Sequence, residues 1–304
     1  MQSERMRKSN ACWFLAGLVL MGGGKDVDAA FRWLIAKAGG GHVVVVRASG
    51  TDAYNPYILK LGASSVETLI IKTPDEARDQ QTLDKIRHAG ALWIAGGDQW
   101  NYVGAWGSSP VRDALQSLID HNIPFGGTSA GLAVLGQYSF TAEKDSITSA
   151  QALADPYHER VTIGTDFLRI PILKGIITDS HFVTRDRMGR LLVFLSRILM
   201  DHQGSGAPPD ARAIAIDERT AALVEPSGAV SIEGESAVYF LRAAAKPEVC
   251  HPGLPLTVRG ISAYRATAGA TFDLRKWTGT GGTGYGLSVE NGVVRSTQPG
   301  GSSY

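Results

Sequence analysis

One local pattern recurs from residue 15 to about residue 225: a short apolar run, a tip rich in glycine or polar residues, and then a helical stretch. The apolar runs cover residues 15–21, 42–47, 68–71, 91–95, 123–126, 175–178 and 213–216. Amphipathic stretches lie between several of them, at residues 26–38, 75–88 and 109–121. Near-continuous apolar strands that alternate with helices indicate a mostly parallel sheet covered on both faces. We therefore expect an α/β fold with an open, doubly wound sheet.

The pattern changes after about Pro226. Short alternating runs at residues 237–241, 258–264 and 292–297 are separated by Gly, Pro and Thr, and Asn291-Gly292 is a type I′ turn signal. We predict an α/β domain over residues 1–225 and a small all-β extension over residues 226–304.

Composition limits the classes of function. The 304 residues are 44% hydrophobic and 19% charged, with a formal net charge of +1. This charge gives no general attraction to nucleic acid or to an anionic membrane. The sequence has no continuous run of about 18 apolar residues, the length that a transmembrane helix needs. Two cysteines, Cys12 and Cys250, are too few for a disulfide framework or a CxxC metal site. We expect Cys12 to be a small buried side chain.

The first residues combine a basic start with an apolar stretch, as in a signal peptide. The apolar stretch is followed by Gly22-Gly23-Gly24-Lys25 and not by a small-residue cleavage site, so we interpret residues 15–21 as the first buried strand. The compartment stays open between cytoplasmic and secreted. The same glycine-rich segment lacks the GxxxxGK[ST] spacing of a phosphate-binding loop.

Polar and small residues follow the predicted strands at their carboxyl ends, where open parallel sheets bind ligands. A serine, a histidine, two acids and several glycines thus fall on one edge of the predicted sheet, which makes that edge a candidate active site. The tips are residues 22–25, 48–51, 96–99, 127–131, 179–181 and 217–218.

The sharpest motif is IPFGGTSAGLAVL at residues 123–135, which fits a strand, a tight turn at Ser129 and a helix. Gly127 and Gly131 are the small residues that a nucleophile elbow requires. The start of the helix would aim N–H groups at a developing oxyanion. We interpret Ser129 as a nucleophile; in the alternative, it caps the helix that follows.

Of the seven histidines, His181 alone follows a predicted strand at the same edge as Ser129. The others open a strand, lie at or past helix ends, or lie in irregular and β segments: His42, His88, His121, His202, His158 and His251. We expect His181 to act as the base for Ser129. The alternative is a loop histidine bonded to Asp179.

Three arginines, Arg185, Arg187 and Arg190, begin the helix after His181. They could bind a substrate carboxylate, which arginine does with two parallel hydrogen bonds. Alternatively, they form a solvated helix face paired with Asp186 and neighbouring acids. The chain order of serine, histidine and acid also differs from the serine, acid, histidine order of α/β-hydrolases.

Four segments resemble, in their order, the cyanophycinase family of serine peptidases, whose relatives include the aspartyl dipeptidases. They are Gly96-Gly97-Asp98-Gln99, Gly127-Thr128-Ser129-Ala130-Gly131, the stretch from Asp179-Ser180-His181-Phe182 to Arg190, and Ile216-Asp217-Glu218-Arg219-Thr220-Ala221. The resemblance covers residues 15–225 and not the β region that follows. It implies a fold similar to class I glutamine amidotransferases, a homodimer, and hydrolysis of a peptide bond after an aspartyl residue. In cyanophycinases proper the substrate is the β-aspartyl-arginine unit of a storage polymer.

The resemblance also assigns roles by position. It implies that Ser129 is the nucleophile, that His181 is its base, and that Glu218 orients His181, with Asp217 adjacent as the other possible acid. The backbone N–H groups of Gly97 and Ala130 would form the oxyanion hole. The substrate pocket would be lined by Gln99, Asp179, Ser180, Arg185, Arg187 and Arg190.

One residue departs from the family pattern. Cyanophycinases typically carry Gln between the aspartate and the histidine, where this chain has Ser180. The shorter side chain removes a polar contact from the pocket. Hydrolase chemistry is untouched by the change, while strict β-aspartyl-arginine specificity is put in question.

We therefore predict a serine peptidase that acts on a peptide substrate through an acyl-enzyme, with no metal and no cofactor. The sequence contains no Cys/His ligand cluster and no dinucleotide fingerprint. Two alternatives stay open. One is an amidase or transpeptidase that uses the same serine and histidine on another acyl substrate. The other is a non-catalytic protein whose pocket binds a peptide or a glycan.

Overall fold

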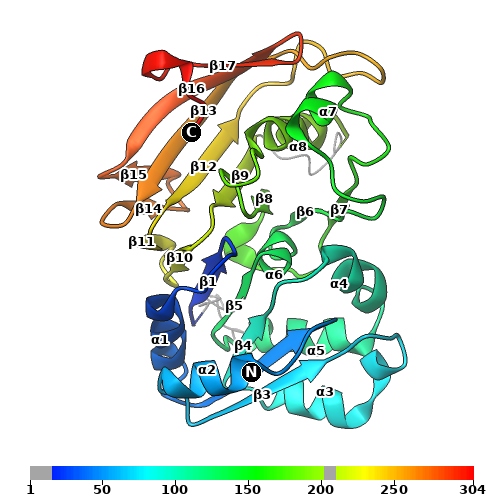
Figure 1. Ribbon diagram of the computed structural model, residues 1–304, viewed down its shortest axis with the longest axis vertical. Coiled ribbons are helices and arrows are strands. Elements are labelled where there is room, and N and C mark those ends of the chain that lie inside the picture. Colours follow the sequence, from blue (N-terminus) through cyan, green and yellow to red (C-terminus); the bar gives the residue numbers. More distant parts are fainter. Residues whose placement is uncertain (1–15, 202–209) are drawn as a thin grey trace, which may run out of the picture.

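Two sheets organise the chain, as the computed structural model shows for residues 16–201 and 210–304 (Figure 1). The first sheet has nine strands in the order β15-β14-β11-β10-β1-β5-β4-β2-β3. Its parallel part consists of β1 (Leu18–Met21), β5 (Phe125–Thr128), β4 (Ala91–Ile94), β2 (His42–Arg47) and β3 (Ser65–Ile70). Antiparallel strands continue it: β10 (Thr220–Val224), β11 (Ala229–Gly234), β14 (Thr271–Asp273) and β15 (Thr278–Thr280).

The second sheet has eight strands in the order β17-β16-β13-β12-β9-β8-β6-β7. Parallel pairing joins β6 (Tyr138–Phe140) to β8 (Ile176–Asp179) and β8 to β9 (Ala211–Ile216). The remaining neighbours are antiparallel: β7 (Ile163–Thr165), β12 (Ala237–Ala243), β13 (Val258–Thr267), β16 (Thr283–Glu290) and β17 (Val293–Ser296).

The fold is α/β, but the expected doubly wound, mostly parallel sheet is not confirmed, because both sheets are mixed. The seven predicted apolar runs do carry strands, namely β1, β2, β3, β4, β5, β8 and β9. Apolar runs show where strands form, but not which strand each one pairs with. Beyond β9, the strands β10 and β11 and the strands β12 and β13 pair as antiparallel neighbours along the chain.

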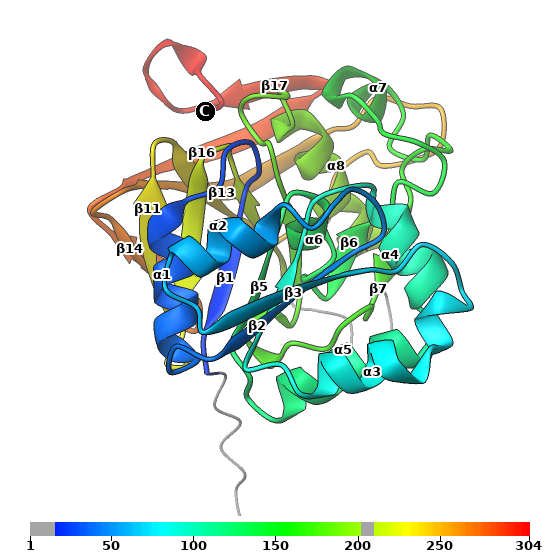
Figure 2. The same cartoon turned by 60° about the horizontal axis from the view of Figure 1, so that its bottom comes forward.

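Helices cover both faces of the parallel strands in the first sheet (Figure 2). On one face, Phe31 and Leu34 of α1 and Ile58 of α2 pack on Val43 and Trp93. The opposite face packs against helices α3 to α6 and also against the second sheet, whose own outer face is covered by α7 and α8. The helices are α1 (Asp28–Lys37), α2 (Tyr54–Lys60), α3 (Gln80–Arg87), α4 (Gln99–Trp106), α5 (Pro110–Asp120), α6 (Ala130–Ala133), α7 (Ser149–Ala154) and α8 (Met188–Asp201), with short 3₁₀ turns η1 (Glu76–Arg78), η2 (Pro171–Leu173) and η3 (Pro299–Gly301).

The strands after residue 225 continue both sheets. Strand β11 pairs with β10 in the first sheet, and β12 pairs with β9 in the second. The hairpin between β16 and β17 turns at Asn291 and Gly292, which both have positive φ, so the predicted turn is confirmed. The domain boundary at residue 225 stays a prediction. Cys12, Leu15 and His202 lie outside the described residues.

The carboxyl ends of strands from both sheets meet at the loop after β1. The His181 backbone N–H, which follows β8, donates to the Gly22 carbonyl over 2.8 Å. The Arg219 N–H, which follows β9, donates to the Gly23 carbonyl over 2.9 Å, and the Ser129 N–H donates to the Met21 carbonyl over 3.2 Å. The candidate residues therefore gather between two sheets, and not along the edge of one.

Candidate active site

Ser129 occupies a sharp turn between β5 and α6. Its φ is 55° and its ψ is −116°, a conformation that non-glycine residues rarely adopt. Its side chain makes no capping hydrogen bond to α6. Instead, Ser129 Oγ lies 2.7 Å from His181 Nε2. The alternative in which Ser129 caps the helix is therefore wrong.

Two glycines allow this turn to pack against β4. A Cβ atom on Gly127 would lie 2.6 Å from the backbone carbon of Gly131. A Cβ atom on Gly131 would lie 2.0 Å from the Ile94 carbonyl oxygen. Real Cβ atoms do not approach other atoms this closely, so both positions require glycine for the strand and helix to cross at this distance.

His181 is 6% exposed and lies in the loop after β8. Its Nε2 faces Ser129, and its Nδ1 lies 2.6 Å from Glu218 Oε1. The alternative partner, Asp179, makes no hydrogen bond with this ring; it binds Arg187 and Arg190. Burial lowers the pKa of His181 below 6.5, and the positive charges of Arg185 and Arg187 act in the same direction, against the opposing hydrogen bond to Glu218. The ring is therefore neutral at pH 7.

The acid that contacts His181 is Glu218 and not its neighbour Asp217. Asp217 Oδ1 accepts hydrogen bonds from the Val183 N–H over 3.1 Å and from the N–H and hydroxyl of Thr184 over 2.9 Å each. Its Oδ2 accepts from the Ser236 hydroxyl over 2.8 Å. Burial alone would raise the pKa of Asp217, but these hydrogen bonds lower it below its ordinary value. Asp217 therefore holds the loop that carries His181.

The glycine run after β1 belongs to this site, as its place among the predicted tips indicated, but the sequence analysis did not foresee what the glycines make room for. A Cβ atom on Gly23 would lie 2.4 Å from His181 Cε1, and one on Gly24 would lie 3.0 Å from Glu218. The run thus leaves room for the imidazole and the carboxylate. Three successive glycines at the carboxyl end of a strand were the available signal, because they allow close approach of another group.

Asp179 and Arg190 form a buried ion pair behind the site. Arg190, 2% exposed, donates from Nη2 to Asp179 Oδ1 over 2.5 Å and from Nε to Oδ2 over 2.9 Å. Arg187 donates to the same Oδ1 over 3.3 Å and to the Ser180 carbonyl over 2.8 Å. Burial alone would raise the pKa of Asp179, but the two guanidinium groups lower it below its ordinary value. Arg187 and Arg190 therefore do not form a solvated helix face.

Arg185 differs from the other two arginines. It is exposed, and no ion pair involves it in the part of the chain that the structure describes. Its expected partner Asp186 accepts a hydrogen bond from the Tyr304 hydroxyl instead, over 2.8 Å. Arg185 lies close enough to His181 for its charge to lower the pKa of that ring. A positive charge is thus left near His181.

The remaining predicted residues lie around the same turn. Ala130 follows Ser129 directly, and a Cβ atom on Gly96 would lie 3.2 Å from Ser129 Cβ, so the tip of β4 that bears Gly97 reaches the serine. Gln99 begins α4 and donates from Nε2 to the Phe140 carbonyl over 3.2 Å.

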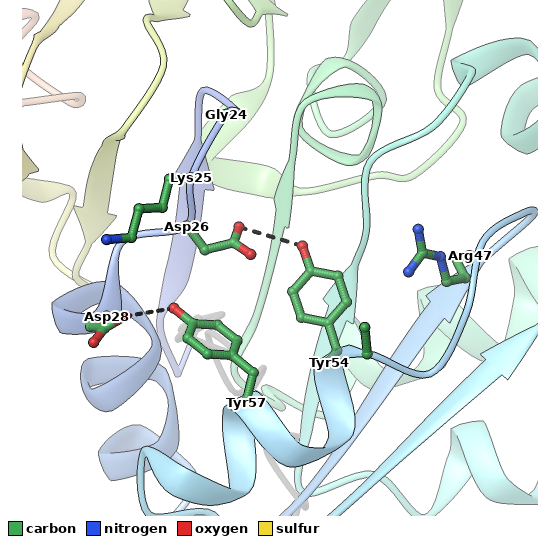
Figure 3. A pocket seen from close by; sticks show the side chains of 8 residues that line it. Gly24, Lys25, Asp26, Asp28, Arg47, Tyr54 and Tyr57 are labelled. Carbon is green, nitrogen blue, oxygen red and sulfur yellow. Dashed lines mark hydrogen bonds between the residues drawn. The ribbon is translucent and has the colours of Figure 1, made fainter.

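A pocket of about 410 Å³ opens beside the glycine run, between residues 24–28 and α2 (Figure 3). Two tyrosine hydroxyls donate to two carboxylates across it: Tyr54 to Asp26 over 3.4 Å and Tyr57 to Asp28 over 2.8 Å. Burial, with a further contribution from Asp28, raises the pKa of Asp26 to about 6, although the Tyr54 hydrogen bond opposes the shift. The pocket is thus lined by aromatic rings and carboxylates.

Residues 16–201 and 210–304 contain no cluster of three or more His, Cys, Asp or Glu side chains that could hold a metal ion. Within the same ranges, no helix is long and apolar enough to cross a membrane. Cys250 is buried and forms no disulfide.

Comparisons with known proteins agree on one family. The family model described as "Peptidase family S51" matches residues 18–157, which include Ser129 and end before His181. Cyanophycinases of Trichormus variabilis (strain ATCC 29413 / PCC 7937) and of Nostoc sp. (strain PCC 7120 / SAG 25.82 / UTEX 2576) are each 27% identical over 224 residues, which is 72% of this chain and 68% of the relative. The crystal structure of a peptidase from an acI-B1 Actinobacterium aligns with a TM-score of 0.55 at 15% identity, over 86% of this chain and 98% of that chain. That likeness supports the fold. The homodimer stays a prediction.

The buried ion pair generates a prediction about stability. The variant Arg190→Met leaves Asp179 buried with the 3.3 Å contact to Arg187 as its remaining ion pair and the hydrogen bond from the Ser180 N–H. We therefore expect the free energy of unfolding to fall by about 3–5 kcal/mol. Because the pKa of Asp179 is lowered in the folded state, its contribution is present above about pH 4 and is lost as the pH falls further. The difference between wild type and variant should therefore shrink in acid. Urea unfolding measures both effects.

The control is Arg259→Met, which breaks an exposed pair with Glu248 of 3.2 Å. Its cost should stay below about 1 kcal/mol. Equal losses for the two variants would show that the buried pair contributes no more than a surface contact.

Proposed function

Because the chain belongs to the cyanophycinase-like peptidases of family S51, we propose that it is a serine peptidase that cleaves an amide bond next to an aspartyl residue. The observation that carries the proposal is a continuous hydrogen-bonded chain. Ser129 Oγ lies 2.7 Å from His181 Nε2, and His181 Nδ1 lies 2.6 Å from Glu218 Oε1. This is the arrangement of nucleophile, base and orienting acid that serine peptidases share on unrelated folds.

Ser129 Oγ attacks the carbonyl carbon of the scissile amide, and its proton passes to His181 Nε2. Glu218 accepts a hydrogen bond from the Nδ1–H of the ring, which leaves the lone pair of Nε2 directed at the serine. The lowered pKa of His181 keeps the ring neutral and able to accept that proton at pH 7. The positive φ of Ser129 turns its hydroxyl out of the strand and toward the histidine.

The negative charge that develops on the carbonyl oxygen is stabilised by the backbone N–H groups of Gly97 and Ala130. Such preorganised donors contribute about 3–4 kcal/mol each to the transition state. His181 then donates its proton to the departing amine, and an acyl-enzyme on Ser129 remains. Water attacks this ester with His181 again as base, and the aspartyl product leaves.

The charge distribution supports an acidic substrate group near the scissile bond. Arg187 and Arg190 are bound to Asp179, whereas Arg185 is an exposed cation on the same loop as Arg187. Arg185 would therefore bind the free carboxylate of a β-linked aspartyl unit. Gln99, at the start of α4, would border the pocket for this aspartyl unit.

The catalytic assignment predicts non-additive losses. Ser129→Ala should lower kcat/KM by about 10⁴-fold or more while the fold is retained, because only a hydroxyl is removed. His181→Ala should be nearly as damaging, and the double variant should cost little more than either change alone. Steady-state kinetics on a β-aspartyl dipeptide measures this, and an active-site serine probe should label the wild type but not Ser129→Ala. An unlabelled wild type would favour a non-catalytic binding protein.

Arg185 generates a second prediction, about pH and specificity. The pKa of His181 lies below 6.5, so kcat/KM should fall only when the pH drops below that value, as the base becomes protonated. In Arg185→Gln a charge that lowers this pKa is removed, so the acid limb should move to higher pH. The preference for β-aspartyl-arginine over its carboxylate-capped ester, about ten- to a hundredfold in the wild type, should disappear. An unchanged preference would place the carboxylate elsewhere.

The pocket of Figure 3 supports a basic residue on the substrate. The Tyr54 hydroxyl points at Asp26 there, over 3.4 Å, and a substrate guanidinium group beside this hydrogen bond would gain an ion pair with the carboxylate. One face of the Tyr54 ring is already covered by Arg47, whose guanidinium carbon lies 5.9 Å from the ring centroid. The Arg47 guanidinium donates to the carbonyls of Ser49 and Thr51, and Lys25 points away from Tyr54.

Asp26→Asn should therefore lower kcat/KM for β-aspartyl-arginine by about tenfold or more, because a charge-assisted contact is lost. The value for β-aspartyl-leucine should be unchanged. The matched control is Asp84→Asn on α3, whose carboxylate lies on the exposed surface. A loss on both substrates in Asp26→Asn would mean that the residue supports the glycine run and not the substrate.

A further inference from the structure

The loop between β8 and α8 carries four of the residues assigned above: Ser180, His181, Arg185 and Arg187. Two of its non-glycine residues, His181 and Asp186, have positive φ values of 46° and 48°. Asp217 holds the first part of this loop through Val183 and Thr184. The second part, from Arg185 to Met188, is held from the other side by a residue far away in the sequence.

That residue is Tyr304, which follows the last strand of the β-rich region. Its hydroxyl donates to Asp186 Oδ1 over 2.8 Å and accepts from the Met188 backbone N–H over 2.8 Å. Its ring packs edge-on against Phe182, next to His181, with the centroids 5.6 Å apart, and against Tyr239 at 6.0 Å. One side chain thus contacts the loop at three places between His181 and the start of α8.

The contact with Asp186 has an electrostatic consequence. Asp186 is the sequence neighbour of both Arg185 and Arg187, so a released carboxylate could pair with the exposed Arg185. In the structure, the Tyr304 hydroxyl engages that carboxylate, and Arg185 is in no ion pair with another described residue. A hydrogen bond to a carboxylate is strong enough to decide between two such partners.

We propose that Tyr304 is a positioning residue, which keeps Asp186 away from Arg185 and so leaves the Arg185 charge free for the substrate carboxylate. The proposal rests on the function proposed above, in which Arg185 binds the aspartyl carboxylate. It gives the β-rich region a part in specificity, although that region contributes no residue to the serine, histidine and acid chain.

The test removes only the hydroxyl. Tyr304→Phe keeps the ring against Phe182 and should raise KM for a free β-aspartyl dipeptide about tenfold, since Asp186 then competes with the substrate. Its kcat should stay within about twofold, and kcat/KM for the carboxylate-capped substrate should be unchanged. The matched control is Tyr264→Phe on β13, which also removes one hydroxyl hydrogen bond, accepted from the Gly282 N–H at 2.7 Å. It should match the wild type on both substrates.

Asp186 supplies the decisive comparison. Asp186→Asn alone should keep the wild-type KM, and the double variant Tyr304→Phe/Asp186→Asn should recover it, because the competing carboxylate is gone. A purely structural role would not be rescued this way. Equal losses on free and capped substrates, no rescue, or a KM for Tyr304→Phe equal to that of Tyr264→Phe would each overturn the proposal. Thermal unfolding of every variant shows that it is folded at the assay temperature.

A second readout does not depend on turnover. His181 faces Glu218, Arg185 and Arg187, and the Arg185 charge lowers its pKa. NMR titration of the His181 imidazole should therefore give a higher pKa in Tyr304→Phe and the wild-type value in the double variant. An unchanged pKa in Tyr304→Phe would also overturn the proposal. No hydrolysis of any aspartyl peptide by the wild type, with these pKa changes present, would instead reject the proposed function and leave the role of Tyr304 standing.

Discussion

The whole site depends on how closely other segments approach the Gly22–Gly24 backbone. This segment directly follows β1 and is hydrogen-bonded to two other segments, the loop after β8 and the turn between β9 and β10. The Gly22 carbonyl accepts from the His181 N–H, the Gly23 carbonyl accepts from the Arg219 N–H, and the Gly22 N–H donates to the Thr220 carbonyl. A Cβ atom on Gly22 would lie 2.0 Å from the Asp217 carbonyl oxygen. Glycine is the residue that permits such contact, because any side chain would force the two sheets apart. The distances between Ser129, His181 and Glu218 follow from this approach.

Around the Gly22–Gly24 backbone, most carboxylates are occupied by partners within the protein, and a few charged groups are left to face the site. Asp179 is paired with Arg190 and Arg187 out of contact with water, where an unpaired carboxylate would be costly. Asp217 is satisfied by four hydrogen bonds from the loop and from Ser236. Asp186 is engaged by Tyr304. With these carboxylates occupied, Glu218 is directed at the histidine and Arg185 stays exposed.

The arrangement also explains how one loop can serve two purposes. His181 lies against Ser129, and three contacts fix its position. Its own N–H donates to the Gly22 carbonyl, the next part of the loop donates to Asp217, and the neighbouring Phe182 packs on Tyr239. In the proposed function an exposed residue of the loop, Arg185, binds the substrate carboxylate. The strong contacts flank Arg185 on both sides, at Thr184 and at Asp186. A rigid support next to an exposed functional group is what precise binding requires.

Contiguous features were readable from the sequence by itself. Seven strands of the predicted α/β region were visible as apolar runs, and the turn at Ser129 was visible because strand, glycines, serine and helix follow one another without a gap. His181 could be identified because it follows a strand at the carboxyl end. Each of these features depends on residues within one turn or one strand, where local conformation follows from residue type.

Tertiary structure alone decided the rest. The mixed pairing of both sheets depends on long-range contacts between strands, which an apolar pattern does not encode. The choice between Asp217 and Glu218 depends on how the chain turns between β9 and β10, where Arg219 has a φ of 55°. Which arginines are paired depends on partners that are distant in the sequence. Arg190 binds Asp179 across 11 residues, and Asp186, the neighbour of Arg185, binds Tyr304 across 118. Residue type shows which side chains can carry charge, but only the folded chain determines which of them remain unpaired.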